Sequence, residues 1–98
     1  MTIKAPFQPA YTTGQVVSPA AAAASVTLLK NSKSVCLTNT GSNTAYVRIS
    51  PTAANATTAD YPVIAGSQVV IGKADDDISL SHISASGTTL HIICGEGF

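Results

Sequence analysis

The stretch VCLTNTGSNTAYVRIS, residues 35–50, decides the fold class of this chain. A strand sends successive side chains to opposite faces of a sheet, so apolar residues at every second position predict a strand with one buried face. The polar centre, Asn39 to Asn43, consists of residues that tolerate positive φ or bond their own backbone, which predicts a tight turn. We therefore expect a β-hairpin. Its buried face is made by Val35, Leu37, Ala45, Val47 and Ile49.

The rest of the chain repeats the pattern of short apolar runs separated by turns. Short apolar runs recur about every ten residues with turn residues between them, and no segment supports a long helix. This pattern predicts an all-β fold: an antiparallel, jelly-roll-like sandwich of about seven to eight short strands over residues 20–98. An immunoglobulin-like sandwich is disfavoured because the chain has no Trp to fill the position that is buried in that fold.

The first 19 residues have a different composition. Pro6 and Pro9 make a regular helix unfavourable, so residues 1–19 are expected to form an extended N-terminal arm. The arm contains two of the five aromatic residues, Phe7 and Tyr11. It either folds back on its own domain or docks on a neighbouring subunit. At the other end, Phe98 either caps the core or inserts into a partner.

Charge is unusually sparse. Charged residues make up 10% of the chain and the formal net charge is zero, against about 25% charged residues in typical soluble domains. Surfaces without net repulsion tend to associate, so we expect a subunit covered in an assembly, as a homo-oligomer (dimer or trimer), rather than a sparsely charged monomer. The scattered lysines disfavour a nucleic-acid partner. No apolar run approaches the ~20 residues that cross a membrane.

The start of the chain lacks the apolar segment of a secretory signal. We therefore expect a protein made in the cytoplasm with reduced Cys36 and Cys94. A disulfide would require their two strands to be neighbours.

No pattern indicates catalysis, a metal or a cofactor. His82 and His91 could be cross-strand neighbours in a hairpin, and we expect them to be a solvent-facing pair. The aspartates 75–77 lack the ligand spacing of a calcium loop and are expected to solvate a turn. No serine lies in a nucleophile elbow. An enzyme is not expected.

Three segments carry a family resemblance: SVCLTNTGSNTAYVRIS (34–50), ATTADYPVIAGS (56–67) and SHISASGTTLHIICGEGF (81–98). An Asn-x-Gly turn, an Ala-Tyr-Val-Arg strand, a Thr-Ala-Asp loop and a Gly-Glu-Gly-Phe tail resemble features of small β-rich virion proteins of tailed bacteriophages. The resemblance covers roughly residues 34–98. It implies a head decoration, or cement, protein that binds outside an icosahedral head and bridges major capsid protein subunits.

On this interpretation the protein is made in the host cytoplasm and is located on the capsid exterior in the virion. The arm would be a strap anchored by Phe7 and Tyr11. The loop 51–60, with Asn55 and Thr57, would be a second contact, and Phe98 is a further candidate anchor. Two alternatives stay open: a tail or head-fibre component, and a small carbohydrate-binding module, which would need exposed aromatic residues.

Overall fold

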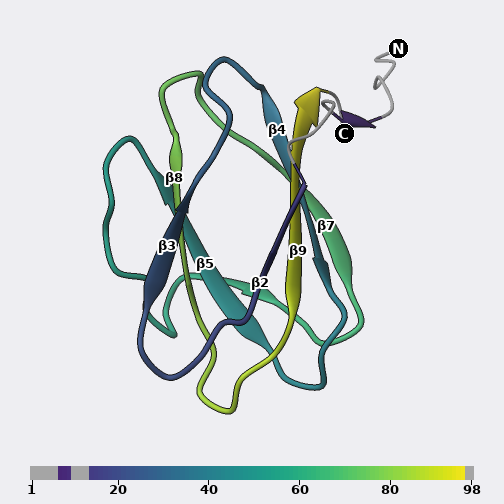
Figure 1. Cartoon of the computed structure of the whole chain (residues 1–98), viewed down its shortest axis with the longest axis vertical. Helices are drawn as coiled ribbons and strands as arrows, with labels where there is room; N and C mark the ends of the chain where they lie inside the picture. Colours follow the sequence, from purple (N-terminus) through teal and green to yellow (C-terminus); the bar gives the residue numbers. More distant parts are fainter. Residues whose placement is uncertain (1–6, 10–13, 97–98) are drawn as a thin grey trace.

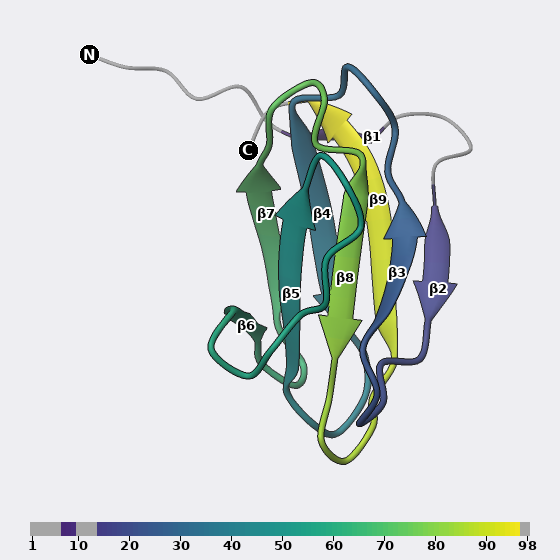
Figure 2. The ribbon, with the colours of Figure 1, turned by 90° about the vertical axis from the view of Figure 1, so that its left-hand side faces the viewer.

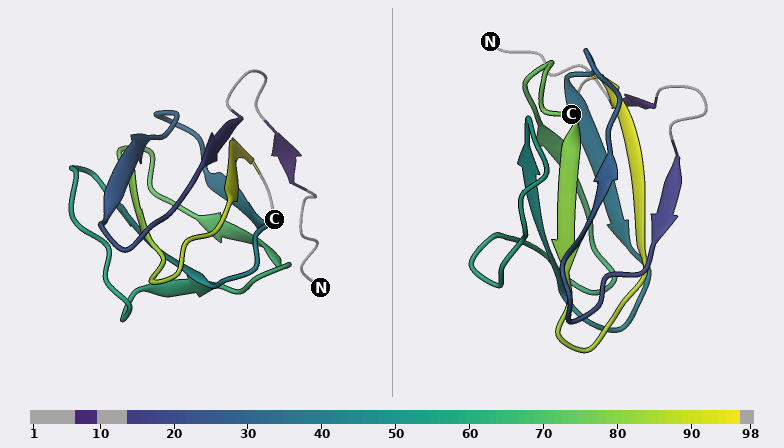
Figure 3. Two further views of the ribbon diagram at one scale, coloured as in Figure 1. Left: turned by 60° about the horizontal axis from the view of Figure 1, so that its bottom comes forward. Right: turned by 60° about the vertical axis from the view of Figure 1, so that its left-hand side comes forward.

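The computed structural model describes residues 7–9 and 14–96, and every regular element within them is a β-strand. The strands form two antiparallel sheets that pack face to face, which confirms the predicted all-β sandwich (Figure 1, Figure 3). Sheet A has the order β1-β9-β4-β7, with β2 also paired to β9; sheet B has the order β3-β8-β5-β6. The strands are β1 (Gln8–Pro9), β2 (Gln15–Val17), β3 (Ala24–Thr27), β4 (Ser34–Asn39), β5 (Ala45–Ser50), β6 (Tyr61–Val63), β7 (Gln68–Gly72), β8 (Ser79–Ile83) and β9 (Leu90–Glu96).

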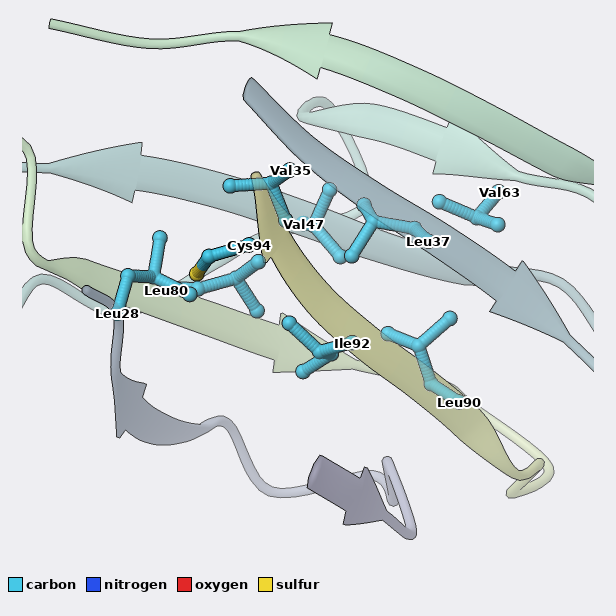
Figure 4. Close-up of a cluster of buried hydrophobic side chains, with 9 residues drawn as sticks. All are labelled: Leu28, Val35, Leu37, Val47, Val63, Leu80, Leu90, Ile92 and Cys94. Atoms are coloured by element: carbon cyan, nitrogen blue, oxygen red, sulfur yellow. The ribbon is translucent and has the colours of Figure 1, made fainter. Parts of the chain in front are cut away.

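The core lies between the sheets and is built by the predicted alternation. Val35 and Leu37 of β4 are fully buried, and Val47 of β5 is 2% exposed. Because aliphatic side chains of both sheets meet in one layer, their burial supplies the main driving force for folding. Figure 4 shows the cluster: Leu28, Val35, Leu37, Val47, Val63, Leu80, Leu90, Ile92 and Cys94.

The predicted hairpin of β4 and β5 is wrong. β4 pairs with β7 and β9 in sheet A, whereas β5 pairs with β6 and β8 in sheet B. The polar centre therefore arches from one sheet to the other. It packs on the β8–β9 connection, since Thr40 N donates to Thr89 O at 3.0 Å and Asn43 Nδ2 donates to Gly87 O at 2.7 Å. Both strands face the same core, so their apolar alternation is the same as that of a hairpin.

The described part of the N-terminal segment belongs to sheet A. β1 and β2 pair with successive parts of β9, in register Pro9↔Gly95 and Gln15↔Ile92. Gln15 Nε2 also donates to Thr27 O at 2.8 Å, which links β2 to β3 of the other sheet. Residues 14–19 thus complete the sandwich, and the rest of the predicted arm, 1–6 and 10–13, lies outside the described residues.

The two cysteines lie on neighbouring strands but on opposite faces of sheet A. Cys36 is opposite Ile93 and Cys94 is opposite Val35 in the β4–β9 ladder. Successive positions of a ladder point in opposite directions, so Cys94 faces the core and Cys36 faces outward. The pairing of these strands therefore does not bring the sulfurs together, which agrees with the expected absence of a disulfide between them.

Candidate interaction surfaces

The charges of the described residues are concentrated at one end of the sandwich. The β3–β4 and β7–β8 turns meet there, where Asn31 N donates to Asp75 O at 3.0 Å. Asp75 also binds the Lys33 ammonium, and this hydrogen bond raises the pKa of Lys33. These groups are exposed, so each ion pair adds little stability. The end comprises Lys30, Lys33, Lys73, Asp75, Asp76, Asp77 and Glu96.

The three aspartates of this end separate rather than converge. Asp75 pairs with Lys33, Asp76 lies 3.9 Å from Lys30, and Asp77 Oδ2 accepts from Ala74 N. Within residues 7–9 and 14–96 no group of three or more potential metal ligands is present. The aspartates therefore act as turn and ion-pair residues.

The predicted histidine pair is wrong. His82 lies on β8 in sheet B and is 4% exposed, whereas His91 lies on β9 in sheet A and is half-buried. The two strands do not form a hairpin because their connection crosses between the sheets. Burial lowers the pKa of His82, and its Nδ1 has no hydrogen-bond partner among the described residues. His82 is thus a neutral core residue.

The outer face of sheet B is covered by the chain itself. The connection 51–60, which we call the covering loop, passes over β8 and β5 (Figure 2). Ala56 is 3% exposed and its N–H donates to Ser81 Oγ at 2.8 Å. Arg48 Nε donates to Asp60 Oδ1 at 3.1 Å. These contacts fix the loop and bury the outward side of β8.

Asp60 also organises the loop internally. Thr57 N donates to Asp60 Oδ2 at 2.7 Å and Asp60 N donates to Thr57 O at 3.1 Å. The Thr57 amide, and then Arg48, hold the pKa of Asp60 below its ordinary value. The covering loop is therefore a defined surface rather than an irregular excursion.

The outer face of sheet A, which we call the A face, is different. The ladder registers place two rows of side chains on it: Val70, Cys36 and Ile93 in one, and Gln68, Thr38, His91 and Val16 in the other. Neither row contains an Asp, Glu, Lys or Arg. All of these side chains except Cys36 are half-buried or exposed, so the described part of the chain leaves this face open.

The apolar row of the A face is tightly filled. Cys36 is 8% exposed although it points outward, since Val70 and Ile93 flank it on the two neighbouring strands. This burial raises the pKa of the Cys36 thiol, which keeps it protonated. Val16, at the margin of the face, is 63% exposed. The A face is thus uncharged and partly apolar, as interface cores are.

A groove opens where the two sheets separate beside β7. It has a volume of about 250 Å³. Val47 and Ile49 line it from sheet B and Ile71 from sheet A, and the other lining residues are Tyr61, Gly72 and Asp77. Tyr61 is 50% exposed. The groove therefore has an exposed aromatic side chain at its rim.

The structure describes three of the five predicted contact residues. Asn55 and Thr57 are exposed on the covering loop, over sheet B. Phe7 is half-buried and precedes β1 of sheet A. Tyr11 and Phe98 lie outside the described residues. The A face and the groove were missed, and the only hint of the groove was Tyr61, an aromatic residue beside a proline.

Comparisons with known proteins add no assignment. A scan against protein-family models, a search of curated proteins and a search of solved structures each gave no significant match. In the part of the chain that the structure describes, no helix could span a membrane.

Proposed function

We propose that this chain is a structural subunit that decorates the outside of a tailed-phage head and stabilises the lattice of the major capsid protein. The observation that carries the proposal is the A face, an uncharged and partly apolar sheet surface whose side chains, apart from Cys36, are half-buried or exposed. The resemblance of residues 34–98 to small virion proteins supplies the identity of the partner.

The jelly-roll arrangement belongs to the same proposal. It is supported by the order of the eight strands β2 to β9, which is 2-9-4-7 in one sheet and 3-8-5-6 in the other. Every connection between consecutive members of this set crosses between the sheets, except that from β5 to β6. Alternation of this kind is typical of a double-sheet roll.

We expect the chain to stabilise the shell through many repeated contacts. An uncharged patch binds through area and shape rather than through ion pairs, so a single contact is weak. A shell presents the same site many times, and a subunit that touches two shell proteins gains from multivalency. Bridging copies would resist separation of the shell proteins under internal pressure. The covering loop, with Asn55 and Thr57, supplies a second exposed surface.

The first test is the copy number of the chain in purified virions of the phage that encodes it, measured by quantitative mass spectrometry against the shell protein. We expect a number comparable to that of the shell protein. A handful of copies would indicate a component of the tail or of a fibre instead, and absence from the particle would refute a virion role.

A second test locates the contact. Thr38→Lys places a charge in the middle of the A face, whereas Ser25→Lys places the same charge on the exposed outer side of β3 in sheet B. Purified variants are added to undecorated heads and bound protein is measured after sedimentation. We expect Thr38→Lys to lose binding and Ser25→Lys to retain it. Equal binding of both variants would exclude the A face.

A further inference from the structure

β7 is an edge strand without the usual protection against pairing. Sheet edges are normally blunted by proline, charge or short length. β6 contains Pro62 and β1 contains Pro9, and on β3 the Thr27 carbonyl is occupied by the Gln15 side chain. In contrast, β7 reads Gln-Val-Val-Ile-Gly, with no proline and no charge, and ends its sheet (Figure 2).

The hydrogen-bonding groups at this edge can be assigned from the register. Asn39 N donates to Ser67 O at 2.9 Å, and Lys73 N donates to Lys33 O at 2.9 Å. Bonded pairs recur at every second residue of an antiparallel ladder, so the odd-numbered residues from 67 to 73 bond to β4. The N–H and C=O groups of Gln68, Val70 and Gly72 therefore point away from β4. No described strand pairs with them.

The space beside this edge is lined by several apolar side chains, together with Asp77. The groove lined by Ile71, Val47 and Ile49 lies on its inner side, and Tyr61 forms part of its rim. Val70 lies on the other side, in the apolar row of the A face. A strand added to β7 would thus satisfy main-chain groups and bury apolar side chains on both of its sides.

We propose that a second copy of this chain occupies the edge, with the two β7 strands paired antiparallel about Val70. In this register Gln68 of each copy is opposite Gly72 of the other, so all three outward-pointing residues form bonded pairs. Centring on Val69 or Ile71 would use only two of them. The segment is therefore complementary to itself in its main chain.

Charge favours the antiparallel orientation. Lys73 and the aspartates 75–77 follow β7 directly, whereas the turn 64–67 before it has no charge. Antiparallel pairing places the charged end of each copy beside the uncharged turn of the other. The two Lys73 residues are then on the order of 20 Å apart. Parallel pairing would instead bring the two acidic turns together. The zero net charge of the chain adds no general repulsion.

The pairing has a consequence for the A face. Since β7 belongs to sheet A, the two copies would share one continuous sheet, and their A faces would lie side by side with the two Val70 side chains at the centre. The dimer rests on the fold alone and not on the proposed function, so its failure and the failure of head binding are separate results.

The experiment is sedimentation equilibrium of the full chain from about 1 µM to about 1 mM, the range in which weak dimers dissociate. Val70→Pro removes an N–H that points outward and leaves the β4–β7 bonds intact. We expect a reversible dimer for the unmodified chain and a monomer for Val70→Pro.

A second variant tests the same contact if Val70→Pro does not fold. Val70→Lys places like charges directly opposite each other and should weaken the dimer by about tenfold or more. Val16→Lys adds the same charge to the A face at its other margin and should have no effect. An unmodified chain that stays monomeric, or a Val70→Lys variant that dimerises as tightly as Val16→Lys, overturns the proposal. The proposal is also overturned if the β7 amides are protected from hydrogen exchange only when heads are present. That result would mean that a strand of the shell protein pairs with the edge.

Discussion

Asn39 provides the strictest test of the reasoning about the fold. Its side chain is 1% exposed at the end of β4. Nδ2 donates to Asn43 O and Val63 O, each at 2.8 Å. Oδ1 accepts from Gly41 N at 3.0 Å and from Thr88 Oγ1 at 2.7 Å. One amide thus holds the arch after β4, strand β6 of the other sheet and the β8–β9 connection together.

Asn39→Asp keeps the shape of the side chain but replaces the two donated hydrogens with an acceptor. The carbonyls of Asn43 and Val63 then face a carboxyl oxygen, and both lose their bond to the side chain. A buried hydrogen bond contributes about 1 kcal/mol and an orphaned buried acceptor costs about 1–3 kcal/mol. We therefore expect about 3–5 kcal/mol of destabilisation at neutral pH, a large part of the 5–15 kcal/mol typical of a domain.

The pH dependence of this loss has a definite sign. A buried carboxylate beside two carbonyl oxygens favours its protonated form, so its pKa in the folded state lies above that in the unfolded state. The folded state then binds more protons, and the deficit relative to the unmodified chain shrinks as the pH falls. A protonated carboxyl can also donate one hydrogen bond to a carbonyl.

The assay is urea unfolding followed by far-UV circular dichroism at about pH 7 and about pH 5. Asn55→Asp makes the same chemical change at an exposed position and should alter stability by less than about 0.5 kcal/mol. A loss for Asn39→Asp no larger than that of Asn55→Asp, or a deficit that grows on acidification, would refute the assigned role of the amide.

Three further changes test separate parts of the structure. Gly41→Ala should lower the free energy of unfolding, measured by thermal unfolding, by about 2 kcal/mol or more, because a Cβ at this position would lie 2.6 Å from Thr89 N. Gly66→Ala should lower it by less, because the space around Gly66 is open although its φ is +76°. Burial lowers the pKa of His82 in the folded state below 6.5, so the unfolded state binds more protons. The free energy of unfolding should therefore fall as the pH drops below 6.5, by at most about 1.4 kcal/mol per pH unit. Urea unfolding at several pH values measures this slope, and an equal slope for the unmodified chain and His82→Leu would contradict the prediction. Asp60→Asn should loosen the covering loop, measured as faster proteolysis within it without a large change in the urea midpoint; an unchanged cleavage rate would show that the carboxylate does not anchor the loop.

The sequence predicted which side chains are buried better than it predicted which strands pair. The alternation of Val35, Leu37 and Val47 depends only on facing a core, and both sheets of a sandwich face the same core. The residues from Asn39 to Asn43 suit a tight hairpin and an inter-sheet arch equally well. What distinguishes the two is the set of partners of the Asn39 amide, which come from distant parts of the chain.

The candidate surfaces also differ in whether they depend on local sequence or on strand pairing. The exposure of Asn55 and Thr57 could be predicted because it is a local property of a polar loop. The A face could not be predicted, since its apolar row joins Cys36, Val70 and Ile93 from three strands that are far apart in the sequence. The assignment of His82 failed for a related reason: its environment depends on which sheet β8 joins.

The A face and the β7 edge belong to one sheet, and this links the two proposals. A single A face is small, so its contact with a shell protein should be weak, with a dissociation constant of about 1 mM or somewhat below. Two A faces held in one plane by paired β7 strands could engage two shell subunits together, and linkage of this kind raises overall affinity by about 10²–10⁴ without any new contact. Val70→Pro changes one residue of each A face, at its margin, and separates the two copies. It should therefore lower head binding by a factor in that range, although Val70 lies at the margin of its own A face. A loss of less than about threefold would mean that copies bind singly, even if they dimerise in solution.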